Sequence, residues 1–384
     1  MKFDLENLHP SYVNGLRRVI LNNVETIGFK TEPYDQSEIN IIENTSSLHN
    51  EFLLHRIGMI PIKYPNPDSF DPDKYQFILD VENKSLSEII NITTKDFKVI
   101  ETSTGTQMDT NIFFPPNPDT KEYILITKLK PNPSGSGEKI KLEGKASKNS
   151  GELNARYSPV SCVTFNNKRD SEKIIARLNE MKQEMSAAHD GTPEQLAEKI
   201  RVMERRFMIM DADRLFIIDS NGNPSHYEFT LESCGVLNSS VILNKAIYML
   251  NTIINRFLVN FERAVEENND IITIEKSDSN MNAYDIIIQN ENHTLGNLLQ
   301  SYILETDDTN NVEFVAYNLP HPLKNFIKLR ISVKDDTVES VKNHINKAIS
   351  YINNINKVLR EIVESEFPET KGSTVVLKRK KKSS

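Results

Sequence analysis

Closely spaced carboxylates are the clearest candidates for chemistry in this chain of 384 residues. Asp211 and Asp213 are separated by one alanine at the end of a helical pattern, and such a pair can hold a divalent cation. Two metal ions held by clustered carboxylates would support phosphoryl transfer. The alternative is a solvated turn after a helix, which is also our interpretation of the pairs Asp307-Asp308 and Asp335-Asp336. An enzyme that uses Asp211 and Asp213 therefore stays open as one hypothesis.

Other motifs of catalysis and metal binding are absent or weak. The sequence has no Walker A loop, no Rossmann glycine fingerprint and no HExxH motif. The eight histidines show no ligand spacing, and we interpret His55 and His293 as structural hydrogen-bonding residues. The two cysteines, Cys162 and Cys234, are too few for a disulfide framework or a cysteine-rich zinc site. We expect both thiols to be reduced and buried.

The charge balance limits the class of partner. A net charge of −8 and a pI near 5.6 argue against a protein whose whole surface binds nucleic acid. The exception is the basic run Lys378, Arg379, Lys380, Lys381 and Lys382, which could contact nucleic acid, an acidic partner or an import receptor, or could be a solvated tail. No stretch is apolar enough to cross a membrane, and the N-terminus has no signal-peptide core. These features predict a soluble protein inside a cell or packaged inside a particle.

Two short helical patterns far apart in the chain are similar to each other. The first reads HPSYVNGLRRVIL and the second reads ENHTLGNLLQSYILE. Aligning Ser11 with Thr294 places Asn14 on Asn297, and bulky aliphatic residues follow at helical spacing in both copies. The hydroxyl residues Ser11 and Thr294 suit helix N-caps. Two such copies predict two related folding units in one chain.

Two long helical patterns carry apolar residues at a repeat of seven. The first spans about 239–267 and the second about 337–367. An apolar seam of this kind needs a partner helix, and the two seams match. We therefore expect the two helices to pack together in a pseudo-twofold arrangement. The seam residues expected at their interface are Leu250, Ile254 and Phe257 in the first helix and Ile345, Ile352 and Ile355 in the second.

Composition predicts an α+β fold with two insertions. Residues 64–139 are rich in proline and glycine between short β-rich runs, which predicts an inserted, mainly β domain. A helical hairpin is predicted over 168–210, where Thr192 and Gln195 have the spacing of a capping box. Each α/β unit is expected to be a small sheet followed by a long helix, and the two units are expected to form an intramolecular pseudo-dimer. The expected divisions are 1–63 with 140–267 for the first unit, 64–139 for the inserted domain, 268–367 for the second unit and 368–384 for a basic tail.

Several segments resemble the alpha-like proteins of multisubunit RNA polymerases. HPSYVNGLRRVILNNVET together with EFLLHRIGMIPI is similar to the N-terminal signature of that family, which includes the third-largest subunit of RNA polymerase II, its archaeal counterpart and bacterial alpha. GELNARYSPVS and HYEFTLESCGVLNSSVILNKAI resemble later segments of the same proteins. The stretch from QNENHTLGNLL to NFIKLRI is similar to the partner, which is the eleventh subunit of RNA polymerase II or its archaeal counterpart.

The resemblance implies two alpha-like subunits fused head to tail, with 268–272 as the candidate join. Such a fusion is associated with large nucleocytoplasmic DNA viruses, and the Asn-, Ile- and Lys-rich composition suits an AT-rich viral genome. We therefore expect a role in viral transcription. The expected location is the host cytoplasm (the viral factory) and the virion, with the nucleus as a further possibility.

The family resemblance implies a scaffold without chemistry of its own. Alpha-like dimers dock the second-largest polymerase subunit and then the largest, and small zinc-binding adaptor subunits contact the same platform. DNA would be reached only through the complex, and no membrane would be involved. Many relatives carry a cysteine cluster in the inserted domain, but this chain has no cysteine between 64 and 145. The missing cysteines predict that the domain holds no metal, and the family resemblance implies no cofactor and no catalytic residue.

The matching motifs imply two sets of interface residues. Because adjacent arginines on a helix cannot both face the core, at least one of Arg17 and Arg18 should point outward. The residues expected to face the second-largest subunit are Asn14, Leu16, Arg17, Arg18, Phe52, His55, Arg56, Gly58 and Pro61. Those expected in the intramolecular interface, besides the seam residues, are His293, Thr294, Leu295, Gly296, Asn297 and Leu298. The alternative function is a free-standing nucleic-acid-binding regulator with the same fold, which would use the basic tail.

Overall fold

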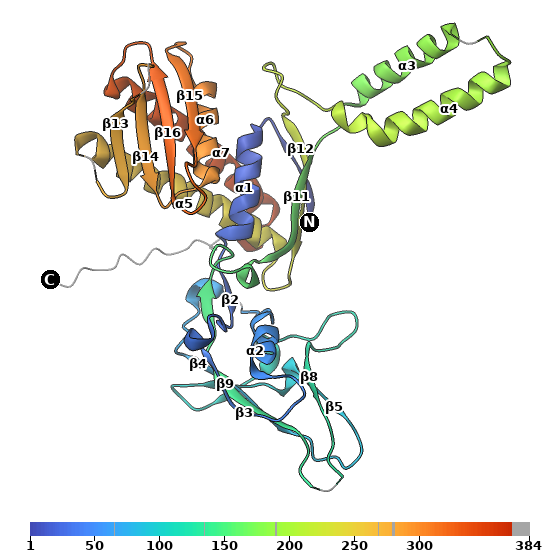
Figure 1. Cartoon of the computed structure of the whole chain (residues 1–384), viewed down its shortest axis with the longest axis vertical. Helices are drawn as coiled ribbons and strands as arrows, with labels where there is room; N and C mark the ends of the chain where they lie inside the picture. Colours follow the sequence, from blue (N-terminus) through green and yellow to red (C-terminus); the bar gives the residue numbers. More distant parts are fainter. Residues whose placement is uncertain (65, 134, 189, 268, 279–280, 371–384) are drawn as a thin grey trace. The chain divides into compact units, whose positions relative to one another are not determined.

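The computed structural model describes residues 1–370 apart from 65, 134, 189, 268, 279 and 280 (Figure 1). It is 40% helical and 26% strand, which agrees with the expected mixture of helix and sheet. The chain separates into two compact units, here called unit 1 and unit 2. Unit 1 comprises Met1–Arg18, Cys162–Leu231 and Leu250–Leu359, and unit 2 comprises Val19–Ser161, Glu232–Met249 and Arg360–Ser384.

Three of the helices described here lie entirely within unit 1, and three others cross its boundaries. The whole helices are α3 (Ser171–Ala187), α4 (Pro193–Met210) and α6 (His293–Glu305). The helices that cross a boundary of unit 1 are α1 (Pro10–Asn22), α5 (Ser239–Glu266) and α7 (Val338–Glu366). The observed bounds of α5 and α7 lie within one residue of those that the apolar seams predict.

A four-stranded antiparallel sheet forms the second half of unit 1, in the strand order β13-β14-β16-β15. Its strands are β13 (Ile272–Lys276), β14 (Tyr284–Gln289), β15 (Val312–Asn318) and β16 (Phe326–Val333). Ile286 lies opposite Leu329 and both are buried, as the alternation of a one-sided sheet requires. On the other face Arg330 donates to both carboxylate oxygens of Asp285, at 2.6 and 2.8 Å.

A three-stranded sheet completes the sheet structure described in unit 1, in the order β1-β12-β11. Its strands are β1 (Lys2–Glu6), β12 (His226–Ser233) and β11 (Val160–Asn167), and the ends of β11 and β12 extend beyond the unit. Phe3 of β1 lies opposite Phe229 of β12, and their rings stack with centroids 5.0 Å apart. This cross-strand pair stabilises the pairing of β1 with β12.

The helices α3 and α4 form a hairpin with a small core of its own (Figure 1). The N-cap Asp170 accepts a hydrogen bond from the backbone N–H of Lys173. Thr192 and Gln195 form the capping box that their spacing predicts. Ile174, Phe207 and Ala212 make up the buried cluster at the base of the hairpin.

Unit 2 is mainly β structure around an aromatic core. Phe29 contacts Phe77 at 5.2 Å and Phe97 at 5.9 Å, and Phe97 contacts Phe114 at 5.2 Å between ring centroids. The main sheet has the order β3-β9-β4-β6-β7, and two smaller sheets pair β5 with β8 and β10 with β2. The elements are β2 (Thr26–Gly28), β3 (Ile39–Asn44), α2 (Asn50–Gly58), β4 (Tyr75–Glu82), β5 (Ile90–Thr93), β6 (Lys98–Glu101), β7 (Gln107–Met108), β8 (Leu125–Leu129), β9 (Lys139–Gly144) and β10 (Ser147–Asn149).

Candidate assembly interface

The two similar helices α1 and α6 begin in the same way, but not at the predicted residue. Pro10 is the first residue of α1, and the backbone N–H of Ser11 donates to His9 Nδ1 at 3.2 Å. Asn292 caps α6, and its side chain accepts from the backbone N–H of Thr294 at 2.9 Å. The prediction that Ser11 and Thr294 are N-caps is therefore wrong. Each cap lies two residues earlier, because a side chain there reaches the second N–H of the helix.

The hydroxyl groups of Ser11 and Thr294, which do not cap the helices, make other contacts. Ser11 Oγ lies 2.8 Å from His9 Nδ1, within the first turn of α1. Thr294 Oγ1 accepts a hydrogen bond from Arg18 Nε at 2.8 Å, which links α1 to α6. Thr294 is buried and Arg18 is half-buried, so this charge-assisted bond is partly shielded from water.

The two helices also meet at positions that are equivalent in their sequences. Aligning Ser11 with Thr294 places Gly15 on Leu298. A Cβ added at Gly15 would lie 3.4 Å from Leu298 Cδ1, so the backbone of α1 approaches this leucine closely. Leu16 and its equivalent Leu299 are both fully buried. A methyl group at position 15 would therefore meet Leu298 at ordinary van der Waals distance, which places the two helices in direct contact at equivalent positions.

Asparagines connect α5 to α7. Asn353 Nδ2 donates to Asn255 Oδ1 at 3.0 Å, and Asn356 Nδ2 donates to Asn251 Oδ1 at 3.3 Å. The Tyr12 hydroxyl of α1 donates to Asn356 Oδ1 at 2.7 Å, and burial raises the pKa of Tyr12 far above its ordinary value. Asn356 is only 1% exposed, so its two bonds satisfy a polar group inside the helix contact.

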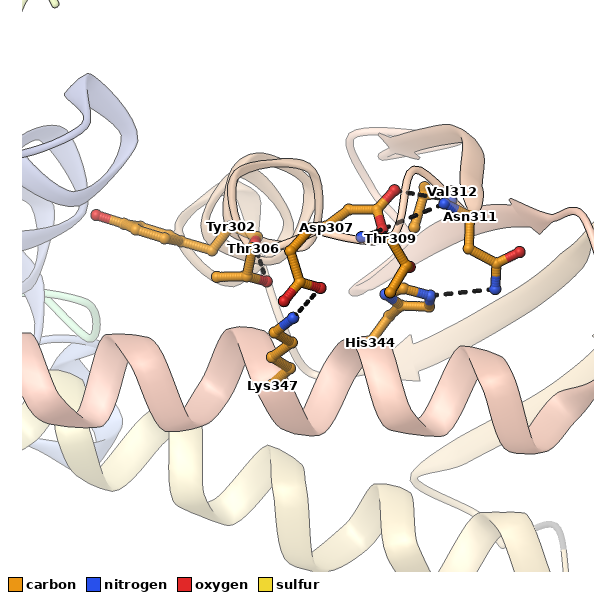
Figure 2. Close-up of polar contacts among 9 residues, drawn as sticks. Tyr302, Thr306, Asp307, Thr309, Asn311, Val312, His344 and Lys347 are labelled. Atoms are coloured by element: carbon orange, nitrogen blue, oxygen red, sulfur yellow. Dashed lines mark hydrogen bonds and ion pairs between the residues drawn. The ribbon is translucent and has the colours of Figure 1, made fainter.

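The turn after α6 lies against α7 (Figure 2). Asp307 accepts hydrogen bonds from the backbone of Asn311 and Val312 and from both the backbone and the hydroxyl of Thr309. Burial alone would raise the pKa of Asp307, but these bonds lower it overall. Asn311 Nδ2 lies 3.4 Å from His344 Nε2 of α7, and Lys347 pairs with Asp308. The turn is thereby held to α7 by polar contacts.

The structure brings the residues expected in the intramolecular interface together in unit 1. His293 is exposed, Asn297 and Ile355 are half-buried, and the others are buried. Gly296 is required because a Cβ there would collide with the Tyr317 ring. Among the buried members are Thr294, Leu295, Leu298, Leu250, Ile254, Phe257, Ile345 and Ile352.

The α1 residues expected to face the second-largest subunit have different surroundings. Leu16 is fully buried, and Arg18 is engaged with Thr294, so both serve the packing of unit 1. Arg17 donates from Nε and Nη2 to Asn14 Oδ1 on the same helix, at 3.2 and 3.1 Å. Within the described part of the chain no ion pair involves Arg17. Its positive charge is therefore available to a partner.

The α2 residues of the same set lie in unit 2, whereas Asn14–Arg18 lie in unit 1. Phe52 is 62% exposed, and His55 and Pro61 are also exposed. Arg56 instead holds α2 to β8, because its Nε donates to the carbonyl of Ile126 at 2.7 Å and its Nη2 donates to that of Leu125 at 2.9 Å. Gly58 is buried, and a Cβ there would collide with the Arg156 guanidinium.

The other candidate residues have ordinary roles in the structure. Asp211 pairs with Arg214 at 3.4 Å, and Asp213 pairs with Arg169 at 2.6 Å. The described residues include no cluster of three His, Cys, Asp or Glu side chains that could hold a metal ion. Asp335 lies in the turn before α7, and Asp336 in the same turn pairs with Lys276 at 2.6 Å. The basic run Lys378–Lys382 lies outside the described residues.

The expectation that both cysteines are buried was wrong. Cys234 follows the end of β12 and is exposed, and Cys162 in β11 is half-buried. Asn356 of the last helix is buried although it is polar and was not among the expected interface residues. Its position four residues after Ile352 was the signal that could have placed it on the buried side. Tyr12, Asn251 and Asn356 are thus interface residues that sequence reasoning missed.

No helix in the part of the chain that the structure describes is long and apolar enough to cross a membrane.

The sequence of this chain is similar to those of RNA polymerase subunits. Residues 283–361 match the model of the RNA polymerase Rpb3/Rpb11 dimerisation domain. The chain is 26% identical over 281 residues to DNA-directed RNA polymerases II, IV and V subunit 3 of Arabidopsis thaliana, covering 65% of this chain and 84% of the relative. It is 26% identical over 269 residues to DNA-directed RNA polymerases I and III subunit rpac1 of Dictyostelium discoideum, covering 64% of this chain and 74% of the relative.

An archaeal relative matches a shorter stretch at higher identity. DNA-directed RNA polymerase subunit Rpo3 of Pyrococcus furiosus is 35% identical over 86 residues, which cover 21% of this chain and 30% of the relative. Residues 283–361 therefore form an Rpb3/Rpb11 dimerisation domain, and the chain is homologous to alpha-like subunits of DNA-directed RNA polymerases.

Proposed function

We propose that this chain is an intramolecular pair of two alpha-like halves and that the pair is an assembly scaffold for an RNA polymerase. The contact between Gly15 and Leu298 carries the proposal, because these residues occupy equivalent positions in α1 and α6. In an isologous interface, residues on the twofold axis contact their own equivalents. Two homologous halves of one chain that pair in this way would show such a contact.

The scaffold docks the second-largest polymerase subunit and then the largest, and small zinc-binding adaptor subunits join the same platform. The homology to polymerase assembly subunits supports this role. We assign two separate contacts to the second-largest subunit: Arg17 in unit 1, and the exposed residues Phe52, His55 and Pro61 of α2 and the segment after it in unit 2. The chain reaches DNA only through that complex and performs no chemistry itself. A free-standing nucleic-acid-binding regulator fits less well, since the net charge is −8.

Joining both halves in one polypeptide has a physical advantage. Tethering converts a bimolecular association into an intramolecular one, with an effective concentration of about millimolar for a short linker. It also fixes a one-to-one ratio of the halves. The segment 268–272 is the proposed join, because α5 ends at Glu266 and β13 begins at Ile272.

A viral source is the further part of this proposal. The fusion of two alpha-like sequences and the Asn-, Ile- and Lys-rich composition motivate it. The subunit would then act in the host cytoplasm and enter the virion with its polymerase. Immunoblotting of purified particles for this chain tests the packaging, and particles without it contradict the viral part alone.

Co-purification tests the scaffold function. The tagged chain is co-expressed with the second-largest polymerase subunit of the same source and analysed by size exclusion. We expect a one-to-one complex for the wild type and for Arg205→Glu, which changes an exposed arginine on α4. Arg17→Glu should elute alone as a folded chain, because a negative charge would replace the positive charge at the proposed contact. A wild-type chain that elutes without the subunit contradicts the scaffold function, and an Arg17→Glu chain that still binds contradicts the assigned surface.

A further inference from the structure

A small cavity in unit 1 lies where four segments meet. It is lined by the turn between β1 and α1, the loop before β12, the end of α6 and the middle of α7. Its volume is about 250 Å³. This is many times the space of one water but below the roughly 300–1,000 Å³ typical of sites for drug-sized ligands. The cavity therefore suits a group the size of one amino-acid side chain.

Three aromatic rings form one wall of the cavity. The ring centroids of His9 and Tyr302 are 6.0 Å apart with an interplanar angle of 64°, and those of Tyr302 and Tyr351 are 5.8 Å apart with an angle of 41°. Figure 2 shows the Tyr302 ring extending from α6 away from the Asp307 turn. The faces of tyrosine rings attract cations, and this attraction is stronger where water is partly excluded.

The charged groups around the cavity are acidic. Asp219 and Glu305 line it, and its lining contains no lysine or arginine among the residues that the structure describes. Asp219 Oδ1 is held in place by the backbone N–H groups of Asn221 and Asn223, each at 2.8 Å. Glu305 makes no hydrogen bond or ion pair within the described part of the chain. Its carboxylate is free to meet a ligand.

The histidine in the wall does not oppose a cation. His9 Nδ1 accepts from the Ser11 backbone, so this nitrogen carries no proton. Burial lowers the pKa of His9, while Glu305 and Asp219 partly offset this effect. The imidazole is therefore neutral at pH 7. The second histidine, His226, lies 4.0 Å from Glu6.

The Tyr302 hydroxyl in the cavity wall is incompletely satisfied. Tyr302 is 1% exposed, and among the described residues its hydroxyl makes no hydrogen bond of normal geometry. Burial raises its pKa, and the nearby His9 backbone N–H offsets this effect in part. A buried polar group without a partner is unfavourable unless a ligand or water satisfies it. A ligand with several N–H donors would satisfy this oxygen and the Glu305 carboxylate together.

We propose that this cavity binds the basic side chain of a partner polypeptide, with arginine as the best match. A guanidinium is planar, carries five donors, stacks on aromatic rings and pairs with carboxylates. The cavity is open to such a side chain, because Tyr351 and Ile218 at its border are 48% and 44% exposed. The site uses only the groups of this cavity, and its ligand chemistry does not depend on the proposed polymerase function.

Ligand-detected NMR on the full chain tests this site. N-acetyl-arginine amide is titrated against the wild-type protein, and the neutral isostere N-acetyl-citrulline amide is the matched ligand. We expect saturable binding of the arginine compound and none of the citrulline compound at the same concentration. Glu305→Gln and Tyr351→Leu should each weaken binding about two- to fivefold, as for exposed ion pairs and cation–π contacts. Glu262→Gln, an exposed carboxylate of α5 outside the cavity, should bind like the wild type.

The outcomes separate the possibilities. Equal binding of the citrulline compound, or absence of arginine binding, overturns the proposal. Arginine binding that Glu305→Gln and Tyr351→Leu leave unchanged places the site elsewhere and also overturns it. Spermidine and Mg²⁺ are added as competitors; if either binds through Glu305 and excludes arginine at equal concentration, the cavity is a small-cation site and not a side-chain site. Circular dichroism of each variant shows whether the fold is retained.

Discussion

The helices α1 and α6 start alike but present different residues one turn later. Arg17 and Arg18 of α1 align with Gln300 and Ser301 of α6. Gln300 Oε1 accepts from the backbone N–H of Tyr317, so α6 is fastened to the strand β15 of its own sheet. Among the described residues, the side-chain hydrogen bonds of Arg17 go to Asn14 of its own helix. One copy of the motif thus contacts its own sheet, while the other carries an arginine that has no ion pair in the described part of the chain.

The long helices α5 and α7 show a second contrast. Residues 243–247 read LNKAI and residues 345–349 read INKAI. Lys245 and Asp68 form an ion pair in unit 2 with only 7% and 16% of their side chains exposed, whereas Lys347 and Asp308 in unit 1 are 44% and 71% exposed. The same lysine position therefore has a structural role in one helix and a peripheral role in the other.

Substitution of the two lysines, one at a time, should give the largest difference in stability between equivalent positions. Lys245→Ala leaves the half-buried Asp68 without its partner, and such a change should cost about 3 kcal/mol, the lower end of the range for buried ion pairs. Lys347→Ala removes an exposed ion pair and should cost about 1 kcal/mol or less. Urea denaturation of both variants measures the difference. Equal losses would contradict the assignment of different roles.

The equivalent leucines of α1 and α6 should instead behave alike. Leu16 and Leu299 are both fully buried, so Leu16→Ala and Leu299→Ala should each reduce the free energy of unfolding by about 2–5 kcal/mol. Thermal and chemical denaturation of the two variants provide the values. If one truncation has little effect, the two helices do not contribute equally to the core.

Alanine substitutions at Gly15 and Gly296 should affect stability differently, because Gly15 faces the helix α6 and Gly296 faces Tyr317 of the strand β15. Gly296→Ala brings a methyl group onto the Tyr317 ring and should cost about 1–3 kcal/mol. At Gly15 the added carbon would lie 3.4 Å from Leu298, which is an ordinary contact. Gly15→Ala should therefore be neutral or stabilise by up to about 1 kcal/mol, since alanine favours helix. A large loss for Gly15→Ala would mean that α1 and α6 approach more closely than described.

The smallest expected difference concerns the two helix caps. Burial lowers the pKa of His9 below its ordinary value of 6.5, so the unfolded chain binds the proton more readily than the folded chain. This contribution to stability is present above pH 6.5 and is lost as the pH falls through the folded pKa. His9→Asn copies the Asn292 cap, which does not titrate, and should flatten the fall in melting temperature between pH 8 and pH 5.5. An unchanged pH profile would show that other groups cause it.

Sequence patterns predicted the long elements better than the contacts. The seams of α5 and α7 and the alternation of β12 fixed those elements within a residue, because burial of one face repeats along them. The caps at His9 and Asn292 were missed because a hydroxyl two residues later looked equally suitable. The pairing of β3 and β4 with β9 joins segments that are distant in sequence, and no local pattern specifies such a register. Polar contacts such as Tyr12 with Asn356 depend on that same long-range packing.

Cutting the proposed join tests the pairing of the two halves most directly. A protease site is inserted after the exposed Asp270, between α5 and β13, and the cleaved protein is analysed by size exclusion and native mass spectrometry. We expect both fragments to stay together one-to-one. Gly15→Trp should weaken their association, because the indole would clash with Leu298. Fragments that separate into folded monomers, or that each form homodimers, would contradict it.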